Sequence, residues 1–123
     1  MADPTLQGRR ILVVEDEYML AEEVCTELQT AEAVVIGPVG RLEAAIDLIQ
    51  SEAAIDGALL DVNLGGENVF PAADLLAARG VPIVFTTGYE ASTFPARFAG
   101  LPRCEKPLAM SKVVEAIGRA VHA

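Results

Sequence analysis

Three carboxyl groups and one amino group stand where apolar runs of the sequence end. Glu15 and Asp16 directly follow the run Ile11–Val14, Asp61 closes the run "GALLD", and Lys106 follows the short segment "RCE". Carboxylates beside an apolar core are costly unless a cation pairs with them. Clustered carboxylates suit Mg²⁺, which binds through a few carboxylates together with phosphate oxygens. A carboxylate can also attack phosphorus and form an aspartyl phosphate.

A hydroxyl group is expected at the same place. Thr86 and Thr87 end the apolar run Val81–Thr87, the next strand-like run after Asp61. In open α/β sheets, the binding site lies beyond the carboxyl ends of the strands, near the point where the strand order reverses. In-line phosphoryl transfer requires positioning and neutralisation of the equatorial oxygens, which metal, lysine and hydroxyl groups supply. We interpret the convergence of these separate segments as a phosphoryl-transfer site.

Each of these residues alone has an ordinary structural explanation. Asp16 is a favoured N-cap residue for the helix that follows, and Asp61 is suited to cap a turn before the next Gly-Gly pair. We interpret Glu17 and the pair Glu22–Glu23 as a solvated helix face. The functional interpretation therefore depends on all the strand-end residues meeting at one edge of the sheet.

The order of the patterns predicts an α/β, doubly wound fold. Five short apolar runs, typical of strands buried on both faces, alternate with stretches in which apolar residues recur at helical spacing. The predicted strands are Ile11–Val14, Ala33–Val39, Gly57–Asp61, Val81–Thr87 and Arg103–Glu105. The predicted helices have apolar faces at Leu20, Val24 and Leu28, at Leu42, Ala45, Ile46 and Ile49, at Val69, Ala73 and Leu76, and at Val113, Ile117, Ala120 and Val121. Such alternation indicates a mostly parallel sheet with helices on both faces.

Some segments carry weaker signals. Segment 88–102 contains two prolines and an interior glycine, which limit any helix there to about one or two turns. We expect it to be mobile before phosphorylation, chiefly over 88–100. The run Ala33–Val39 is expected to stop at its Gly-Pro pair. We expect a flexible N-terminal segment over 1–9 and a single domain over 10–122.

The composition is that of a single acidic domain. The chain has 123 residues, of which 52% are hydrophobic, and 18 acidic against 9 basic residues give a net charge of -9. This charge disfavours nucleic acid or an anionic membrane as the main partner. Cys25 and Cys104 have no metal-ligand spacing and are expected to be small core residues. No apolar run reaches the ~20 residues of a membrane span, and no secretion signal opens the chain, so we expect a cytoplasmic protein.

With these residues placed, the chain resembles the receiver domains of bacterial two-component response regulators. The resemblance is carried by "ILVVEDE", "ALLDVNL", "VFTTGY" and "EKPLAM", in the family's order and at its usual separations, from about Arg10 to His122. It implies a flavodoxin-like receiver fold with five parallel strands in the order 2-1-3-4-5. "VFTTGY" further resembles the Phe-Ala-Thr-Gly-type loop of an alphaproteobacterial single-domain subgroup, in which the fourth helix is often irregular.

The resemblance implies a role for each residue at the strand ends. Asp61 would accept the phosphoryl group, Thr87 would turn toward it, and Lys106 would pair with it. The magnesium ligands would be Glu15, Asp16, Asp61 and the backbone carbonyl of Asn63. The Lys106–Pro107 peptide bond would be cis, as it is in similar domains.

The resemblance also implies partners. The phosphoryl donor would be a histidine kinase or a histidine phosphotransfer protein, with small phosphodonors as substitutes. The protein would catalyse only its own phosphorylation and dephosphorylation, and would not otherwise be an enzyme. Its output would be a protein–protein contact or phosphate shuttling, without nucleic acid or membrane, as a monomer or weak dimer.

Three positions depart from the family's pattern. Glu15 stands where Asp is commoner, so a longer side chain would hold the metal. Arg103 lies three residues before Lys106, where many receivers carry the aromatic partner of the threonine, so we do not expect an aromatic switch of the usual kind. Thr86 replaces the Ala of the subgroup's loop.

Several alternatives stay open at this point. One is an interaction module that keeps the receiver fold without phosphorylation, and another is a receiver excised from a longer regulator. A phosphatase similar to the haloacid-dehalogenase-like enzymes would carry a second Asp two residues after the nucleophile, where this chain has Asn63. A flavodoxin-like nucleotide binder would need a phosphate-cradling loop after the first strand, where Glu15–Glu17 would repel phosphate unless a metal intervened.

Overall fold

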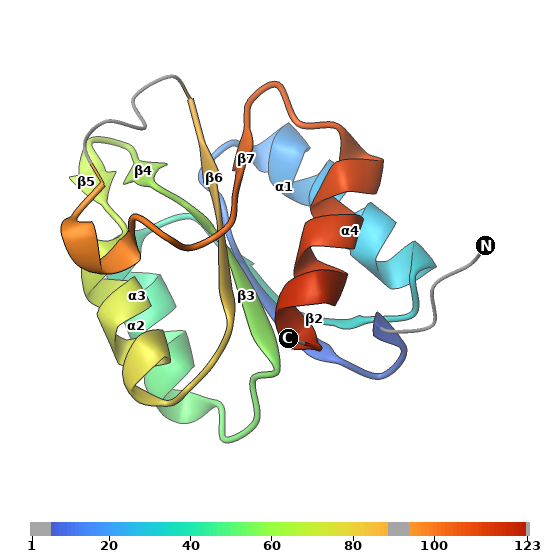
Figure 1. The fold of residues 1–123 in the computed structure, drawn as a ribbon, viewed down its shortest axis with the longest axis horizontal. Coiled ribbons are helices and arrows are strands. Elements are labelled where there is room, and N and C mark those ends of the chain that lie inside the picture. The colour runs from blue at the N-terminus through green and yellow to red at the C-terminus, as the bar shows by residue number, and fades with distance from the viewer. Residues whose placement is uncertain (1–5, 89–93, 123) are drawn as a thin grey trace.

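The protein is a five-stranded parallel sheet between two pairs of helices (Figure 1). The computed structural model describes residues 6–88 and 94–122. The sheet strands are β1 (Arg10–Val14), β2 (Val34–Val39), β3 (Gly57–Asp61), β6 (Ile83–Thr87) and β7 (Arg103–Glu105), and the helices are α1 (Tyr18–Thr30), α2 (Leu42–Ser51), α3 (Phe70–Ala78) and α4 (Met110–Val121). The strands run in the order β2-β1-β3-β6-β7, which confirms the predicted fold and strand order.

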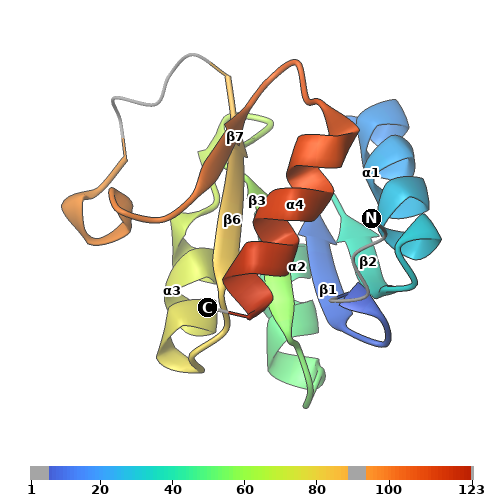
Figure 2. The ribbon, with the colours of Figure 1, turned by 45° about the vertical axis from the view of Figure 1, so that its right-hand side comes forward.

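The helices cover the two faces of the sheet in pairs. α1 and α4 lie together on one face, and α2 and α3 lie together on the other (Figure 2). Every residue of β3 and β6 is buried, because both faces of these central strands are covered. Leu60 and Phe85 face the core beneath α2 and α3, whereas Leu59 and Val84 face the core beneath α1 and α4. Apolar residues therefore fill the strands, and polar side chains gather where the strands end.

All four phenylalanines of the chain lie in the core beneath α2 and α3. Phe85 on β6 and Phe70 at the start of α3 meet Phe94 and Phe98, which precede β7. The ring centroids of contacting pairs are 5.0 to 6.0 Å apart, mostly edge to face. Aromatic pairs at such distances stabilise beyond the area that they bury. This phenylalanine cluster joins β6 to the segment that leads into β7.

Charged side chains tie that same segment to its neighbours. Arg97 Nε and a second guanidinium nitrogen donate to the two carboxylate oxygens of Asp74 on α3, at 2.8 and 2.9 Å. The hydrogen bond from Arg97 holds the pKa of Asp74 below its usual range. The Arg103 guanidinium lies 3.9 Å from the centroid of the Phe94 ring. Arg103, which stands where many receivers carry an aromatic residue, therefore packs over the ring of Phe94.

The segment 88–102 agrees with the expectation of little helix. Its one helical element is η3 (Ala96–Phe98), a single 3-10 turn among the described residues. Residues 89–93 lie outside the described part of the chain. The predictions of an irregular helix and of mobility over 88–100 therefore fall in part, over 89–93, outside the described residues.

The predicted range Ala33–Val39 agrees closely with β2, but the expected stop at its Gly-Pro pair is wrong, because β2 continues through this pair to Val39. Leu12 pairs with Ile36 and Val14 pairs with Val39, so β2 has one more residue than β1 over this stretch. The Gly37–Pro38 peptide bond is cis, and Gly37 has φ of +97°. A β-bulge absorbs the additional residue and lets the strand resume. The Gly-Pro signal therefore marked an irregularity inside a strand.

A short hairpin between β3 and α3 was not predicted. β4 (Asn63–Leu64) pairs in antiparallel fashion with β5 (Glu67–Asn68). Gly65 and Gly66 form the two-residue loop, both with positive φ, as this kind of hairpin turn requires. The hairpin stands beside the carboxyl ends of β1 and β3, where the site is expected.

The N-terminal segment is partly packed. Leu6 is buried against the core beneath α1 and α4, and the Gly8 N–H donates to the Glu32 carbonyl at 2.9 Å. Residues 1–5 lie outside the described residues, so the expected flexible segment 1–9 has at least one anchored residue. Cys25 is buried and Cys104 is half-buried, and burial raises the pKa of each thiol. Among the described residues, no helix is long and apolar enough to cross a bilayer.

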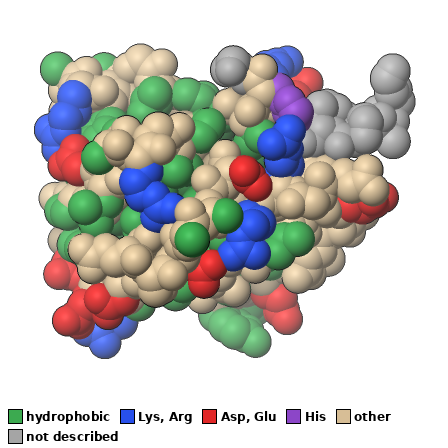
Figure 3. All heavy atoms as spheres, turned by 90° about the horizontal axis from the view of Figure 1, so that it is seen from below, with side chains coloured by type: hydrophobic (Ala, Val, Ile, Leu, Met, Phe, Trp, Pro, Cys, Tyr) green, Lys and Arg blue, Asp and Glu red, His purple; other side chains and the backbone are tan. Residues whose placement is uncertain are grey.

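At the amino ends of the strands, basic and acidic side chains are interspersed over the surface (Figure 3). Arg10 pairs with the Glu52 carboxylate, and its backbone N–H donates to Asp56. Arg79 donates to three backbone carbonyls, those of Ile49, Glu52 and Ala53, and so satisfies the C-terminal end of α2. Arg10 and Arg79 therefore both have polar partners at this edge of the sheet.

We predict that Gly37→Ala destabilises the protein by about 2 kcal/mol or more. A Cβ at this position would lie 3.0 Å from the Val13 carbonyl oxygen and 3.1 Å from the Val39 nitrogen, in addition to the strain of positive φ. Gly100→Ala is the matched control, because a Cβ there meets nothing within 4 Å. Urea unfolding of both variants would measure the difference, and equal midpoints would contradict the bulge as described.

We predict that Thr86→Val raises the stability of the protein by about 1 kcal/mol. The Thr86 hydroxyl is buried and has no hydrogen-bond partner among the described residues. Valine keeps the shape of the side chain and removes the unpaired group. The control is Thr26→Val, the same change at an exposed position of α1, which should have little effect. Thermal unfolding measures both, and a lower midpoint for Thr86→Val would indicate a hydrogen bond that supports the fold.

Candidate functional site

Lys106 lies at the centre of the residues that the sequence brought to the strand ends. Its Nζ atom is 2.9 Å from Asp61 Oδ2, 3.3 Å from Glu15 Oε2 and 3.1 Å from Glu17 Oε1. The Asp61 and Glu15 side chains are each only 5% exposed, and that of Lys106 is 21% exposed. The predicted convergence of Glu15, Asp61 and Lys106 is therefore present in the structure.

The loop after β1 places Glu15 and Asp16. The Glu15 N–H donates to the Val39 carbonyl at 2.9 Å, which fixes the loop against the end of β2. Gly40 allows this close approach, since a Cβ on it would lie 3.1 Å from Asp16 Cα. The N-cap residue of α1 is Glu17, without a side-chain capping bond, so Asp16 does not cap the helix. The ordinary explanation for Asp16 fails, and its exposed carboxylate lies beside Glu15 and Asp61.

Asp61 is held from two sides. It ends β3, in register with Thr86 on β6, and its Oδ1 accepts the Asn63 N–H at 3.3 Å. The turn-capping explanation therefore accounts for one of its two oxygens. The other oxygen faces Lys106.

Lys106 and Thr87 are joined through the backbone. The Lys106 N–H donates to the Thr87 carbonyl at 2.8 Å, which sets Lys106 directly beyond the last pair of β6 and β7. The Lys106–Pro107 bond is cis, as the resemblance implied. The Thr87 side chain is buried, and the residue lines the same pocket as Asp61 and Lys106.

An open pocket of about 820 Å³ gives access to these groups, and the unpredicted hairpin lines part of it. The lining residues are Asp16, Glu17, Asp61, Val62, Asn63, Gly65, Gly66, Asn68, Phe70, Thr87, Gly88 and Lys106. Asn63 Oδ1 accepts the Gly66 N–H at 2.8 Å, which closes the hairpin loop. The sequence did contain a signal for this element, because Gly-Gly between short extended segments favours a two-residue hairpin.

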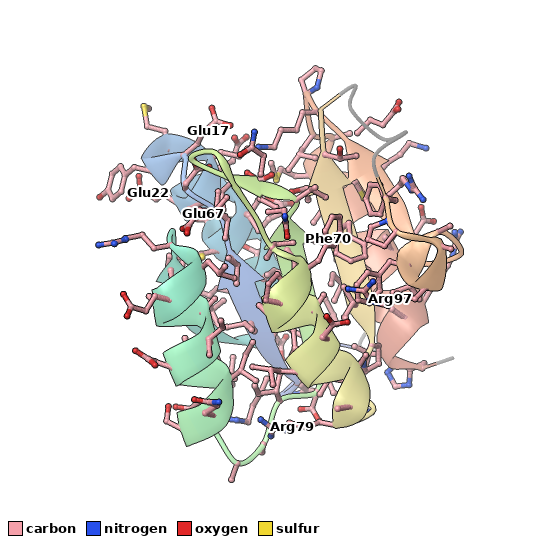
Figure 4. The ribbon with its side chains drawn as sticks, turned by 90° about the vertical axis from the view of Figure 1, so that its left-hand side faces the viewer. Glu17, Glu22, Glu67, Phe70, Arg79 and Arg97 are labelled. Carbon is pink, nitrogen blue, oxygen red and sulfur yellow. The ribbon has the colours of Figure 1, made fainter. Side chains whose placement is uncertain are left out.

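Glu17 makes a contact in the site that the sequence did not predict. Glu17, Glu22 and Glu23 are all exposed, as the interpretation of a solvated face requires. The Glu17 carboxylate in addition accepts from Lys106, 89 residues away in the sequence, at 3.1 Å. Figure 4 shows Glu17 at the site end of the molecule and Arg79 at the opposite end. No local sequence pattern signals such a pairing.

One ammonium group does not neutralise the carboxylates around it. Burial, followed by the hydrogen bond with Asp61 and its charge, raises the pKa of Glu15 to about 8, and the nearby ammonium offsets this only in part. Burial alone lowers the pKa of Lys106, but the hydrogen bond and charge of Asp61, followed by Glu15 and Glu17, raise it above its usual value. The ammonium is therefore firmly charged, and negative charge remains in excess around it.

The donor atoms fit a hard divalent cation. One carboxylate oxygen from each of Glu15, Asp16 and Asp61 lies within 4.8 Å of the others. The set contains oxygen donors alone, from a few carboxylates at the mouth of a pocket, which is the kind of site that Mg²⁺ prefers. Burial and the neighbouring Asp61 raise the pKa of Glu15, and a bound cation would favour the ionised form of this carboxyl group.

Comparison with known proteins gives structural relatives over nearly the whole chain. No family model matches the sequence, and no curated protein sequence matches it. The solution structure of SdrG from Sphingomonas melonis Fr1 is 36% identical, with a TM-score of 0.81 over 94% of this chain and 98% of that chain. The BeF₃-activated conformation of SdrG from Pseudomonas melonis Fr1 is 34% identical, with a TM-score of 0.75 over 98% and 99% of the two chains.

A response regulator receiver protein from Sinorhizobium medicae WSM419 shares the fold, with 24% identity and a TM-score of 0.80 over 96% of this chain and 98% of that one. These relatives match in fold, in length and, for SdrG, in sequence. The chain therefore belongs to the receiver domains of response regulators.

Proposed function

We propose that this protein is a single-domain response regulator that accepts a phosphoryl group on Asp61. The observation that carries the proposal is the position of Asp61, whose carboxylate lies in an open pocket 2.9 Å from the Lys106 ammonium and beside Glu15 and Asp16. A nucleophile, a cation for the phosphoryl oxygens and a set of metal ligands thus share one pocket. The similarity to SdrG over almost its full length supports the same assignment.

The proposed donor is a phosphohistidine on a histidine kinase or a histidine phosphotransfer protein. An Asp61 carboxylate oxygen attacks phosphorus in line with the P–N bond, which breaks while the new O–P bond forms, and a proton returns to the histidine nitrogen. With acetyl phosphate as the donor, acetate leaves instead. Lys106 pairs with an equatorial oxygen, and the Thr87 hydroxyl donates to another.

The proposed metal site uses the carboxylates of Glu15, Asp16 and Asp61 and the backbone carbonyl of Asn63. Mg²⁺ bound there supplies positive charge to the phosphoryl oxygens. Glu15 orients the site from a buried position, and its long side chain also reaches Lys106. SdrG has a BeF₃-activated conformation, and BeF₃⁻ becomes tetrahedral, like a phosphoryl group, when a carboxylate oxygen binds it. That property of a relative supports a site of the same kind here.

The proposed output is a contact with a downstream protein, or the shuttling of phosphate to another domain. Thr87 ends the strand that carries Phe85, so a movement of Thr87 would shift Phe85 against Phe94, which Arg103 covers. A phosphorylation switch requires a segment with two alternative arrangements, and we propose this segment for that part. Four expectations stay predictions: that the protein acts only on its own phosphoryl group, that it is cytoplasmic, that it has no nucleic-acid or membrane partner, and that it is a monomer or weak dimer.

A phosphorylation-independent module and a phosphatase are less well supported. A module without phosphorylation would have no need of three crowded carboxylates around one lysine, which leave negative charge in excess at the site. A haloacid-dehalogenase-like phosphatase would use a second Asp as proton donor, but Asn63 occupies that place and its amide closes the hairpin loop.

The direct test is the intact mass of the protein after incubation with Mg²⁺ and acetyl phosphate. The expected result is one phosphoryl adduct on the wild type, lost with chelator and absent from Asp61→Asn. The matched control is Asp47→Asn, which removes an exposed carboxylate of α2 that is not among the residues lining the pocket and should leave the adduct unchanged. A histidine-kinase transfer assay should give the same pattern. An adduct that persists in Asp61→Asn, or none from either donor, would refute the proposal.

We also predict that Mg²⁺ stabilises the protein more at pH 8.5 than at pH 6. The folded-state pKa of Glu15 is raised from 4.5 to about 8, so without metal its contribution is fully present below pH 4.5 and is lost as the pH rises through about 8. Mg²⁺ requires the ionised carboxylate and relieves this loss. The increase in Tm with Mg²⁺ should therefore grow across this range.

Two variants check the assignment of this effect. Glu15→Gln should flatten the metal-free pH profile between pH 5 and 8, because the titrating group is gone. Asp16→Asn should weaken the increase in Tm with Mg²⁺ while the metal-free profile keeps its slope. Equal midpoints with excess Mg²⁺ and with chelator at pH 8.5 would count against the metal site.

A further inference from the structure

Glu17 differs from the other carboxylates around Lys106 in its exposure. Its side chain is 64% exposed, whereas those of Glu15 and Asp61 are each 5% exposed. Its Oε1 atom accepts from Lys106 Nζ at 3.1 Å, from the outer side of the pocket. Its backbone is fixed, because the Glu17 N–H donates to Glu15 Oε2 at 3.1 Å. The backbone of Glu17 is thus anchored, and water can solvate its carboxylate when the contact with Lys106 breaks.

Lys106 pairs with carboxylates in this structure, and in the proposed reaction it pairs with the phosphoryl group. In the structure it donates to three carboxylates, and its three N–H groups allow no further donation. An anionic group that enters the pocket and accepts a hydrogen bond from Lys106 must therefore displace one of these three carboxylates. Asp61 and Glu15 are buried and held by backbone donors, from Asn63 and Glu17 respectively. Glu17 is the partner that can leave at the lowest cost, because water solvates its carboxylate.

We propose that Glu17 is a positioning residue that holds Lys106 across the mouth of the pocket and is displaced when a phosphoryl-bearing anion enters. It acts through Lys106 and by its own negative charge, so it competes with the donor for the pocket and does not take part in the transfer. The inference rests on the proposed function, because it assigns a regulator to the same site. It implies that Glu17 lowers the affinity of the pocket for a phosphodonor.

The test compares Glu17→Gln with Glu22→Gln. Both variants remove one negative charge from the N-terminal half of α1 or the residue before it, and both positions are exposed. Figure 4 shows Glu17 and Glu22 at the same end of the molecule. Within the described residues, a contact with Lys106 is recorded for Glu17 and none is recorded for Glu22. The pair therefore separates the loss of a specific partner from the loss of a charge.

The first readout is the rate of phosphorylation against acetyl phosphate concentration, at fixed Mg²⁺. We expect Glu17→Gln to lower the half-saturating concentration about three- to fivefold, with the maximal rate changed less than about twofold. Glu22→Gln should lower the half-saturating concentration by less than about 1.5-fold, because its charge is screened. Equal shifts in the two variants would reduce the effect to net charge and overturn the proposal. A change confined to the maximal rate would also overturn it.

The second readout does not depend on phosphoryl transfer. The ¹⁵N–¹H signal of the Lys106 ammonium, assigned with Lys106→Arg, reports how firmly its protons are held. We expect its hydrogen exchange to be several-fold faster in Glu17→Gln than in the wild type or Glu22→Gln, and inorganic phosphate with Mg²⁺ to perturb this signal at lower concentration. An unchanged signal in Glu17→Gln would refute the inference. If the wild type accepts no phosphoryl group, the proposed function fails, and the lysine signal still decides the role of Glu17.

Discussion

The attraction between Lys106 and the carboxylates around it is the interaction on which this site depends. It joins the loop after β1, the end of β3 and the residue after β7, three segments that are far apart in the sequence. The same ammonium is outnumbered, since Glu15, Asp16, Asp61 and Glu17 all lie at or beside the pocket that it occupies. A buried carboxylate pair with one cation is costly to keep. The carboxyl edge of the sheet therefore stores unrelieved charge that a metal or a change of protonation can relieve.

The architecture explains why this charge lies where it does. Helices cover both faces of β1, β3 and β6, so these strands have room only for apolar side chains. Polar groups can enter only where the strands end, and parallel strands all end in the same direction. The bulge at Gly37 and the small residue Gly40 let β2 and the following chain approach the acidic loop closely. The parallel sheet covered on both faces therefore explains both the apolar core and the gathering of charged residues at the carboxyl edge.

The sequence predicted the parts of the molecule that depend on local pattern. The five sheet strands, the helix faces and the place of Glu15, Asp16, Asp61, Thr87 and Lys106 followed from apolar runs and their polar ends. The described part of the segment after Thr87 holds a single 3-10 turn, in agreement with the expectation of little helix from its prolines and glycines. These features are encoded within a few residues of where they appear.

The features that were missed depend on pairing between distant or irregular segments. A Gly-Pro pair usually ends a strand, but here the neighbouring strand holds it and the pairing resumes beyond it. The hairpin after Asp61 has strands of two residues each, too short for any periodicity to show. Glu17 looks like any exposed residue at the start of a helix, because its partner Lys106 comes from the far end of the chain. Tertiary context decided the bulge and the contact of Glu17, whereas the hairpin is local and carries a Gly-Gly turn signal.

The uneven distribution of aromatic rings has a practical consequence for spectroscopy. All four phenylalanines lie on one side of the sheet, the chain has no tryptophan, and of its two tyrosines the one that the structure describes, Tyr18, is exposed on α1. Phenylalanine ring-current shifts of methyl groups beneath α2 and α3 will therefore report on one cluster, and methyl groups beneath α1 and α4, across the sheet from these four rings, provide an internal reference. The phenylalanine rings thus act as an intrinsic probe of the side of the sheet that adjoins the segment between β6 and β7.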